Sequence, residues 1–386
     1  MKKENIISIL VYLVVFAVAI IYGFTVLQTH FNHSYFSQID SVPLYAVYII
    51  VSVISGVFVA GVLQEFGHFL GAKTGGYKII SWCLFYFTFY LDKENKRKFK
   101  FASYDGLGGE TKIVPNYEKK EKPNPYPYLF YGSIFNLAWI VICFFIFFTY
   151  MSIEGIYGDM AYYFLTMGII ATLMTAYNIM PTKLDSLTDG YRLTLIKKDV
   201  EGFNQRLEAE NGGLLADSEA KKIEKADENK PTKFIPEVAI NNVYPLIVEK
   251  KYDEALKVLE EVLEHSQEAN SKTIFEANSQ KVFINILAKE KNELLDYYEK
   301  EVSFQFRREL SNDNTMPGIR TYMLTAGLLD GSLSEVLLTL KKVVKAYKNV
   351  PNNRKHYEVV LFNEALDMLI EQHPKWEELP NYRLYE

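Results

Sequence analysis

The sequence predicts an all-α membrane bundle of four transmembrane helices, a cytosolic, membrane-associated β-hairpin, and a C-terminal α-helical soluble domain. Residues 1–181 contain long uncharged runs rich in Ile, Val, Phe and Tyr, whereas residues 199–386 are crowded with Glu, Lys, Asn and Asp. The loops between the apolar runs differ sharply in positive charge. We therefore divide the chain into a transmembrane domain (1–198), a charged linker (199–233) and a cytosolic helical domain (234–386).

Four apolar runs are long enough to cross about 30 Å of hydrocarbon as helices. They cover residues 6–27, 44–72, 126–150 and 160–180, and the last three contain no Lys or Arg. The first run is longer than the core of a signal peptide, usually about 7–15 residues, and lacks a small-residue cleavage pattern, so we expect a retained span. Tyrosines near the proposed ends fit the interface, where aromatic rings are favoured: Tyr126, Tyr128, Tyr131, Tyr150 and Tyr157.

Loop charges predict the orientation of the spans. Residues 29–43 and 151–159 contain no Lys or Arg, whereas residues 73–123 contain eleven. Loops rich in Lys and Arg stay on the cytosolic side. The sequence therefore predicts a multi-pass protein of the cell membrane with both termini and the 73–123 loop in the cytosol.

Within this loop, residues 79–91 are rich in aromatic and β-branched side chains. Residues 92–98 form a charged turn, and residues 99–101 alternate Phe, Lys and Phe. Thirteen apolar residues are too few to cross as a helix. We expect a β-hairpin that lies against the membrane surface or packs on the spans.

Composition excludes some classes of function. The soluble half carries most of the acidic excess of a chain whose net charge is -5, so nucleic acid is not an expected partner. The two cysteines, Cys83 and Cys143, lie in unlike surroundings and predict no stabilising disulfide.

Polar side chains inside apolar spans are costly and mark candidate sites. The second span contains Gln64, Glu65 and His68 near its cytosolic end. Gln64 and His68 are four residues apart and share a helix face, with Glu65 beside them. This spacing matches the H-E-x-x-H zinc motif, in which two His bind metal and Glu is the general base, except that the first His is Gln.

The third and fourth spans carry polar residues at a similar depth. The third contains Gly132, which allows close approach of helices, and Asn136, which can hydrogen-bond between them. The fourth ends at Asn178 and Pro181, and two carboxylates, Asp185 and Asp189, follow. We expect these segments to meet Gln64 and His68 near the cytosolic face.

With Asp189-Gly190, these motifs resemble those of the site-2 protease family of intramembrane zinc metalloproteases, over residues 44–192. The segment 107–112, with its paired glycines, resembles the membrane-associated β segment of that family. The resemblance implies hydrolysis of a peptide bond within the membrane by a zinc-activated water. It assigns Glu65 as general base, His68 and Asp189 as zinc ligands, and Asn136 and Asn178 with Gly132 as substrate-binding residues.

Two departures from the family pattern bear on activity. Gln64 stands where the family has a ligand His, and a carboxamide is a weak zinc ligand, so we expect impaired or lost metal binding. The interval between Pro181 and Asp189 is longer than is usual for the family, which makes Asp185 a rival ligand. Three functions stay open: an intramembrane zinc peptidase, a non-catalytic pseudoprotease that binds membrane segments or partner proteins, and an unrelated membrane anchor for the helical domain.

The soluble half shows helical spacing of apolar residues, as in Leu256, Leu259 and Leu263. The stretch around these residues resembles the second half of a tetratricopeptide unit, although no clean repeat period is present. We expect either a short array of helical hairpins with a surface for a protein partner, or a compact helical domain without a groove.

Overall fold

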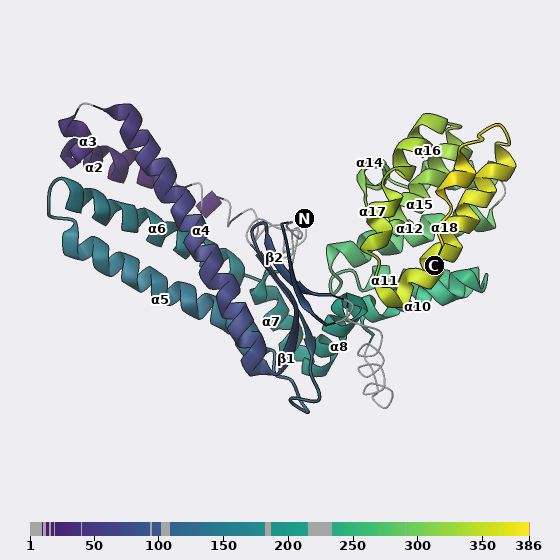
Figure 1. Cartoon of the computed structure of the whole chain (residues 1–386), viewed down its shortest axis with the longest axis horizontal. Coiled ribbons are helices and arrows are strands. Elements are labelled where there is room, and N and C mark those ends of the chain that lie inside the picture. The colour runs from purple at the N-terminus through teal and green to yellow at the C-terminus, as the bar shows by residue number, and fades with distance from the viewer. Residues whose placement is uncertain are drawn as a thin grey trace. The chain divides into compact units, whose positions relative to one another are not determined.

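The computed structural model divides the chain into two compact units, Met1–Leu207 and Glu208–Glu386 (Figure 1). The residues that it describes are 10, 13–14, 17–18, 20–39, 41–92, 95–101, 109–181, 187–214, 234–289 and 291–385.

Three described helices of the first unit are long and apolar enough to cross a membrane: α4 (Val42–Gly75), α5 (Tyr126–Tyr150) and α6 (Ile156–Ile179). The predicted span 126–150 coincides with α5, while α4 and α6 begin two to four residues before the predicted starts. Most of the predicted first span, residues 6–27, lies outside the described residues. The described residues there are helical and end in η1 (Tyr22–Leu27).

The predicted loop at 29–43 is also partly helical. It contains α2 (Gln28–His33) and α3 (Tyr35–Gln38). His30 of α2 is buried, with Nε2 2.9 Å from Asp159 Oδ1 on α6 and Nδ1 2.9 Å from the Tyr45 hydroxyl on α4. These contacts attach α2 to the ends of α4 and α6.

The predicted hairpin is too simple, because the chain builds a four-stranded antiparallel sheet. Its strands are β1 (Tyr77–Leu84), β2 (Phe87–Leu91), β3 (Arg97–Phe101) and β4 (Gly109–Pro115), in the order β3-β2-β1-β4. The stretch 79–91 turns at Phe85, whose φ is +52°, and so contributes to two strands. Strand β4 pairs with β1 on the side away from the hairpin, and both pack against α4 (Figure 1).

Close contact between α4 and α5 depends on glycine. A Cβ on Gly67 would lie 2.4 Å from the backbone nitrogen of Gly132, and a Cβ on Gly71 would lie 2.1 Å from the carbonyl oxygen of Pro127. No larger residue fits at such distances, so these glycines let the two backbones touch. The contact brings the polar part of α4 against the start of α5.

The segment after α6 continues as α7 (Asp189–Lys198) and α8 (Val200–Asn211). Phe203 and Leu207 of α8 are buried in a core with Tyr77, Ile113 and Leu129, so the first part of the predicted linker packs on the first unit. Residues 215–233 of that linker lie outside the described residues.

The second unit is helical throughout its described residues apart from short connections. Its elements in chain order are η2 (Gly212–Leu214), α10 (Pro236–Val248), α11 (Tyr252–Glu264), α12 (Ser271–Ala288), α13 (Lys291–Lys300), α14 (Phe304–Asn312), α15 (Met316–Leu324), η3 (Thr325–Leu329), α16 (Leu333–Leu340), α17 (Val343–Lys348), α18 (Asn352–Gln372) and η4 (Leu379–Tyr382).

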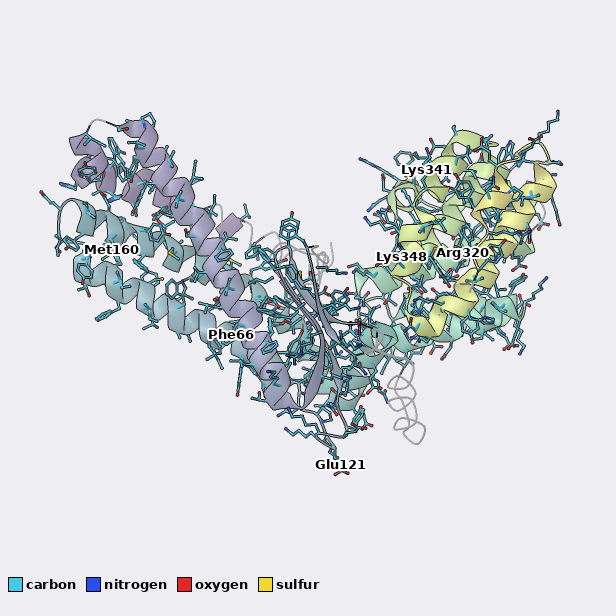
Figure 2. All side chains as sticks on the ribbon, in the orientation of Figure 1. Phe66, Glu121, Met160, Arg320, Lys341 and Lys348 are labelled. Atoms are coloured by element: carbon cyan, nitrogen blue, oxygen red, sulfur yellow. The ribbon has the colours of Figure 1, made fainter. Side chains whose placement is uncertain are left out.

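A buried ion pair crosses the interior of this unit. Arg320, labelled in Figure 2, is fully buried and its Nε lies 3.2 Å from Glu358 Oε2. Its guanidinium also donates to Gln280 Oε1 at 2.7 Å and lies over the ring of Phe283. The pair links α15, α18 and α12 inside one hydrophobic core.

The contact between α4 and α5 predicts the effect of a single methyl group. Gly67→Ala lowers the free energy of unfolding by about 1–3 kcal/mol, because the α5 backbone must move away. Gly23→Ala is the control, since a Cβ there meets no atom within 4 Å. Unfolding of both variants by denaturant in detergent micelles measures the difference, and equal stability would contradict this account of the interface.

Candidate functional site

Three polar side chains of α4 lie near the end of the helix that packs on α5 and the sheet. Gln64 and His68 stand one turn apart on one face, and Glu65 is beside them. Glu65 and His68 are each 7% exposed, and the neighbouring Phe66, labelled in Figure 2, is 40% exposed. The helix therefore presents an apolar side chain outward and a polar cluster inward.

The ring of His68 is oriented by a backbone carbonyl. Its Nδ1 lies 2.7 Å from the carbonyl oxygen of Tyr128, so Nδ1 carries the proton and donates. In the neutral ring, Nε2 is then a hydrogen-bond acceptor with a free lone pair. Many metal-binding histidines donate from one ring nitrogen to a backbone carbonyl in this way and leave the other nitrogen for the metal.

Asp189 reaches His68 from the start of α7. Its Oδ2 lies 3.3 Å from His68 Nε2, and Asp189 is 5% exposed. Thr188 caps α7 by accepting from the Tyr191 backbone, and the partial positive charge of a helix N-terminus favours a carboxylate in the first turn. A Cβ on Gly190 would lie 1.8 Å from the Ile179 carbonyl oxygen, so glycine lets α7 begin directly against the end of α6.

The side chain of Gln64 lies between these two groups. Its Nε2 is 3.1 Å from His68 Nε2 and 3.2 Å from Asp189 Oδ2. With the ring proton on Nδ1, the His68 Nε2 atom and the Asp189 carboxylate oxygen are both acceptors, and each needs a donor. The two N–H groups of the Gln64 amide supply one donor to each.

Asn136 fixes the direction of this amide. Its Nδ2 donates to Gln64 Oε1 at 2.9 Å, which turns the Gln64 nitrogen toward His68 and Asp189. Gly132 provides the space, because a Cβ there would lie 2.7 Å from Gln64 Nε2. Asn136 is 1% exposed, and its Oδ1 has no hydrogen-bond partner among the described residues.

Asn178, at the end of α6, binds Asp189 through two hydrogen bonds. Its Nδ2 donates to Asp189 Oδ2, and its Oδ1 accepts from the Asp189 backbone nitrogen at 3.3 Å. The two asparagines thus lie on either side of the cluster, each bound to one of its members.

Glu65 is directed toward the sheet. Its Oε2 accepts from the Thr111 hydroxyl at 2.7 Å, and its backbone carbonyl accepts from Trp82 Nε1 at 3.3 Å. A Cβ on Gly109 would lie 2.3 Å from Glu65 Cγ, so strand β4 approaches the carboxylate closely only because it begins with glycine.

The structure therefore brings Gln64, His68, Asn136, Asn178 and Asp189 into one hydrogen-bonded cluster, with Gly132 and Glu65 beside it. Asp185 lies outside the described residues.

Sequence reasoning missed several supporting residues. Tyr128 was expected at the membrane interface, but it is 3% exposed, and its hydroxyl donates to the Thr111 carbonyl and accepts from Arg192. Trp82 and Thr111 had no assigned role at all. Backbone carbonyls and strand contacts such as these have no sequence motif. Of these residues only Thr111 had a sequence signal, because it lies beside the paired glycines of 107–112.

The donor set falls short of a tight zinc site. Structural and catalytic zinc sites have three or four His, Cys, Asp or Glu ligands. The described residues contain no group of three or more such side chains arranged to hold a metal ion. His68 and Asp189 supply two, and the third position presents the neutral amide of Gln64, whose nitrogen faces them.

Comparison with known proteins adds no relative. No protein-family model, curated protein or solved structure matches the chain.

The cluster predicts a cost for removing the Gln64 amide. Gln64→Leu leaves the Asn136 amide, His68 Nε2 and Asp189 Oδ2 buried without this partner, and an unsatisfied buried polar group costs about 1–3 kcal/mol. Denaturant unfolding in micelles should show a loss of that size. Phe66→Leu, an outward-facing change on the same helix, is the control, and a Gln64→Leu protein as stable as this control would contradict the hydrogen-bond assignment.

Proposed function

We propose that the first unit is a site-2-protease-like intramembrane scaffold that acts on membrane-spanning peptide segments, with zinc-dependent cleavage impaired by Gln64. One observation carries the proposal. His68 from α4 and Asp189 from the start of α7 lie 3.3 Å apart, within a bundle of helices of membrane-crossing length. The pair comes from two segments 121 residues apart in the chain, each predicted from its own motif.

In this proposal His68 and Asp189 are the remaining zinc ligands, and Glu65 is the general base. The hydrogen bonds of Asn136 and Asn178 support positioning of Gln64 and Asp189, in addition to the substrate-binding role that the family resemblance gives them with Gly132. Asp185 stays a proposed rival ligand, since 182–186 are not among the described residues.

A second candidate is a non-catalytic pseudoprotease that binds membrane segments or partner proteins without cutting them. The observation in its favour is the Gln64 amide, which donates to both His68 Nε2 and Asp189 Oδ2 and so occupies the single lone pair of that ring nitrogen and one acceptor site of the carboxylate. The two candidates differ in whether zinc displaces this amide.

The charges of the loops support the proposed placement in the membrane. Lys and Arg gather in residues 73–123 and are lacking in 29–43 and 151–159. We therefore place the sheet, α7 and both termini on the cytosolic side of a multi-pass cell-membrane protein, with the sheet against the membrane. The helical unit is proposed to take a protein partner there.

Zinc content tests the role of Gln64. Purified wild-type protein should contain zinc well below one equivalent, whereas Gln64→His should approach one. Removing a residue that only hydrogen-bonds to a metal ligand lowers metal affinity about 10–100-fold. Adding an imidazole ligand should therefore raise the zinc affinity by at least about 100-fold. Elemental analysis after dialysis gives the content. Stoichiometric zinc in wild type that is lost in Asp185→Ala or His68→Ala would overturn the prediction.

Cleavage tests the role of Glu65. Gln64→His should cut a model membrane-spanning segment faster than wild type, and Gln64→His with Glu65→Ala should keep zinc but lose cleavage. The assay follows product fragments in detergent or liposomes, with zinc measured on the same samples. Cleavage by the double variant would remove Glu65 as the base. A zinc-loaded Gln64→His protein that binds the segment without cutting it would favour the pseudoprotease.

A further inference from the structure

A cavity of the first unit lies between the C-terminal end of α4 and the sheet. Its volume is about 600 Å³. Phe69 and Lys73 line it from α4, Trp82, Phe89 and Arg97 from three strands, and Lys119 from the segment after β4. It is separate from the Gln64 cluster, none of whose members lines it.

The wall of this cavity is positively charged. Lys73, Lys78, Arg97 and Lys119 line it, and the described residues that line it include no Asp or Glu. The contacts of two of these cations are with neutral groups. Lys73 Nζ lies 4.4 Å from the centroid of the Phe69 ring, and Lys119 Nζ donates to the Lys73 carbonyl oxygen at 2.9 Å. Their charge therefore stays available to an anion in the cavity.

The inner wall is aromatic. The ring centroid of Trp82 lies 5.7 Å from that of Phe69 and 5.8 Å from that of Phe89. Indole rings are enriched at the boundary between hydrocarbon and lipid headgroups, and Lys and Arg gather on its cytosolic side. The apolar run of α4 ends beside this cavity, and Lys73 is the first Lys or Arg of the helix.

Phe89 connects the cavity to an exposed apolar surface. Strands β2 and β3 pair Phe87 with Phe101 and Phe89 with Phe99, so these four rings share one face of the hairpin. Their exposure ranges from 47% to 70%, while Thr88, on the opposite face of β2, is fully buried. A contiguous exposed apolar patch marks a surface for a protein partner or a membrane, and the neighbouring apolar helices favour the membrane here.

We propose that this cavity binds the headgroup of an anionic phospholipid, with the acyl chains along the aromatic face of the β2–β3 hairpin. A phosphate group suits the cations, and the continuous apolar face suits a molecule with long hydrocarbon chains. A soluble phosphate would use the cations alone and leave Phe89 and its neighbours without a role. This site goes beyond the proposed peptide-segment function and depends on none of its residues.

Trp82 provides the probe. Full-length protein with Trp139→Phe and Trp376→Phe retains Trp82 as its single tryptophan. In nanodiscs of phosphatidylcholine, brominated phosphatidylglycerol should quench Trp82 at low mole fraction, and brominated phosphatidylcholine should quench it only weakly. Equal quenching by the two lipids at equal mole fraction would overturn the proposal.

Charge variants test the cationic wall. Lys73→Gln with Arg97→Gln should weaken the phosphatidylglycerol effect roughly 25-fold, since each cation near an anionic lipid contributes about a five-fold change in affinity. Lys341→Gln with Lys348→Gln, two exposed positions of the helical unit labelled in Figure 2, removes the same charge and should change nothing. An equal loss in both double variants would contradict a specific site.

Two further arms keep the result interpretable. If the double variant fails to fold, Arg97→Gln alone takes its place, because Arg97 is exposed on its strand. This single variant should weaken the phosphatidylglycerol effect about five-fold. Inorganic phosphate at millimolar concentration should not displace the lipid. Full displacement by phosphate would identify a site for a soluble anion and overturn the lipid assignment.

Discussion

The first unit depends on the Gln64 carboxamide, which lies between an acceptor atom of His68 and one of Asp189. His68 Nε2 and Asp189 Oδ2 would repel across 3.3 Å without a donor or a cation between them, and the Gln64 amide donates to both. Asn136 holds this amide in one orientation from α5. The interaction therefore ties α4, α5 and α7 together.

Glycine makes this convergence possible. Gly67 and Gly132 let α4 and α5 touch, and Gly190 lets α7 begin against the last turn of α6. Gly109 lets strand β4 reach Glu65. Each polar side chain buried among apolar helices needs a hydrogen-bond partner. A buried polar group without one costs about several kcal/mol. Close backbone approach is what supplies those partners.

Much of this arrangement could be predicted from residue patterns, and the remainder had no local signal. Helix α5 follows from an uninterrupted apolar run, and the meeting of His68 with Asp189 follows from motifs at equal depth. The division of residues 79–91 into two strands was missed because the turn at Phe85 and Tyr86 lacks Gly, Asn or Asp, and a bulky residue rarely adopts positive φ. The Tyr128 carbonyl that orients His68 belongs to the backbone and has no sequence signature.

The protonation of His68 tests the central interaction most directly. Side-chain nitrogen chemical shifts of the ¹⁵N-histidine-labelled full-length chain, assigned by comparison with His68→Gln, report which ring nitrogens carry protons. We expect a single ring proton, on Nδ1, and an unprotonated Nε2 that accepts from Gln64. A ring protonated on both nitrogens, or on Nε2 alone, would show that the Gln64 amide does not bridge His68 and Asp189.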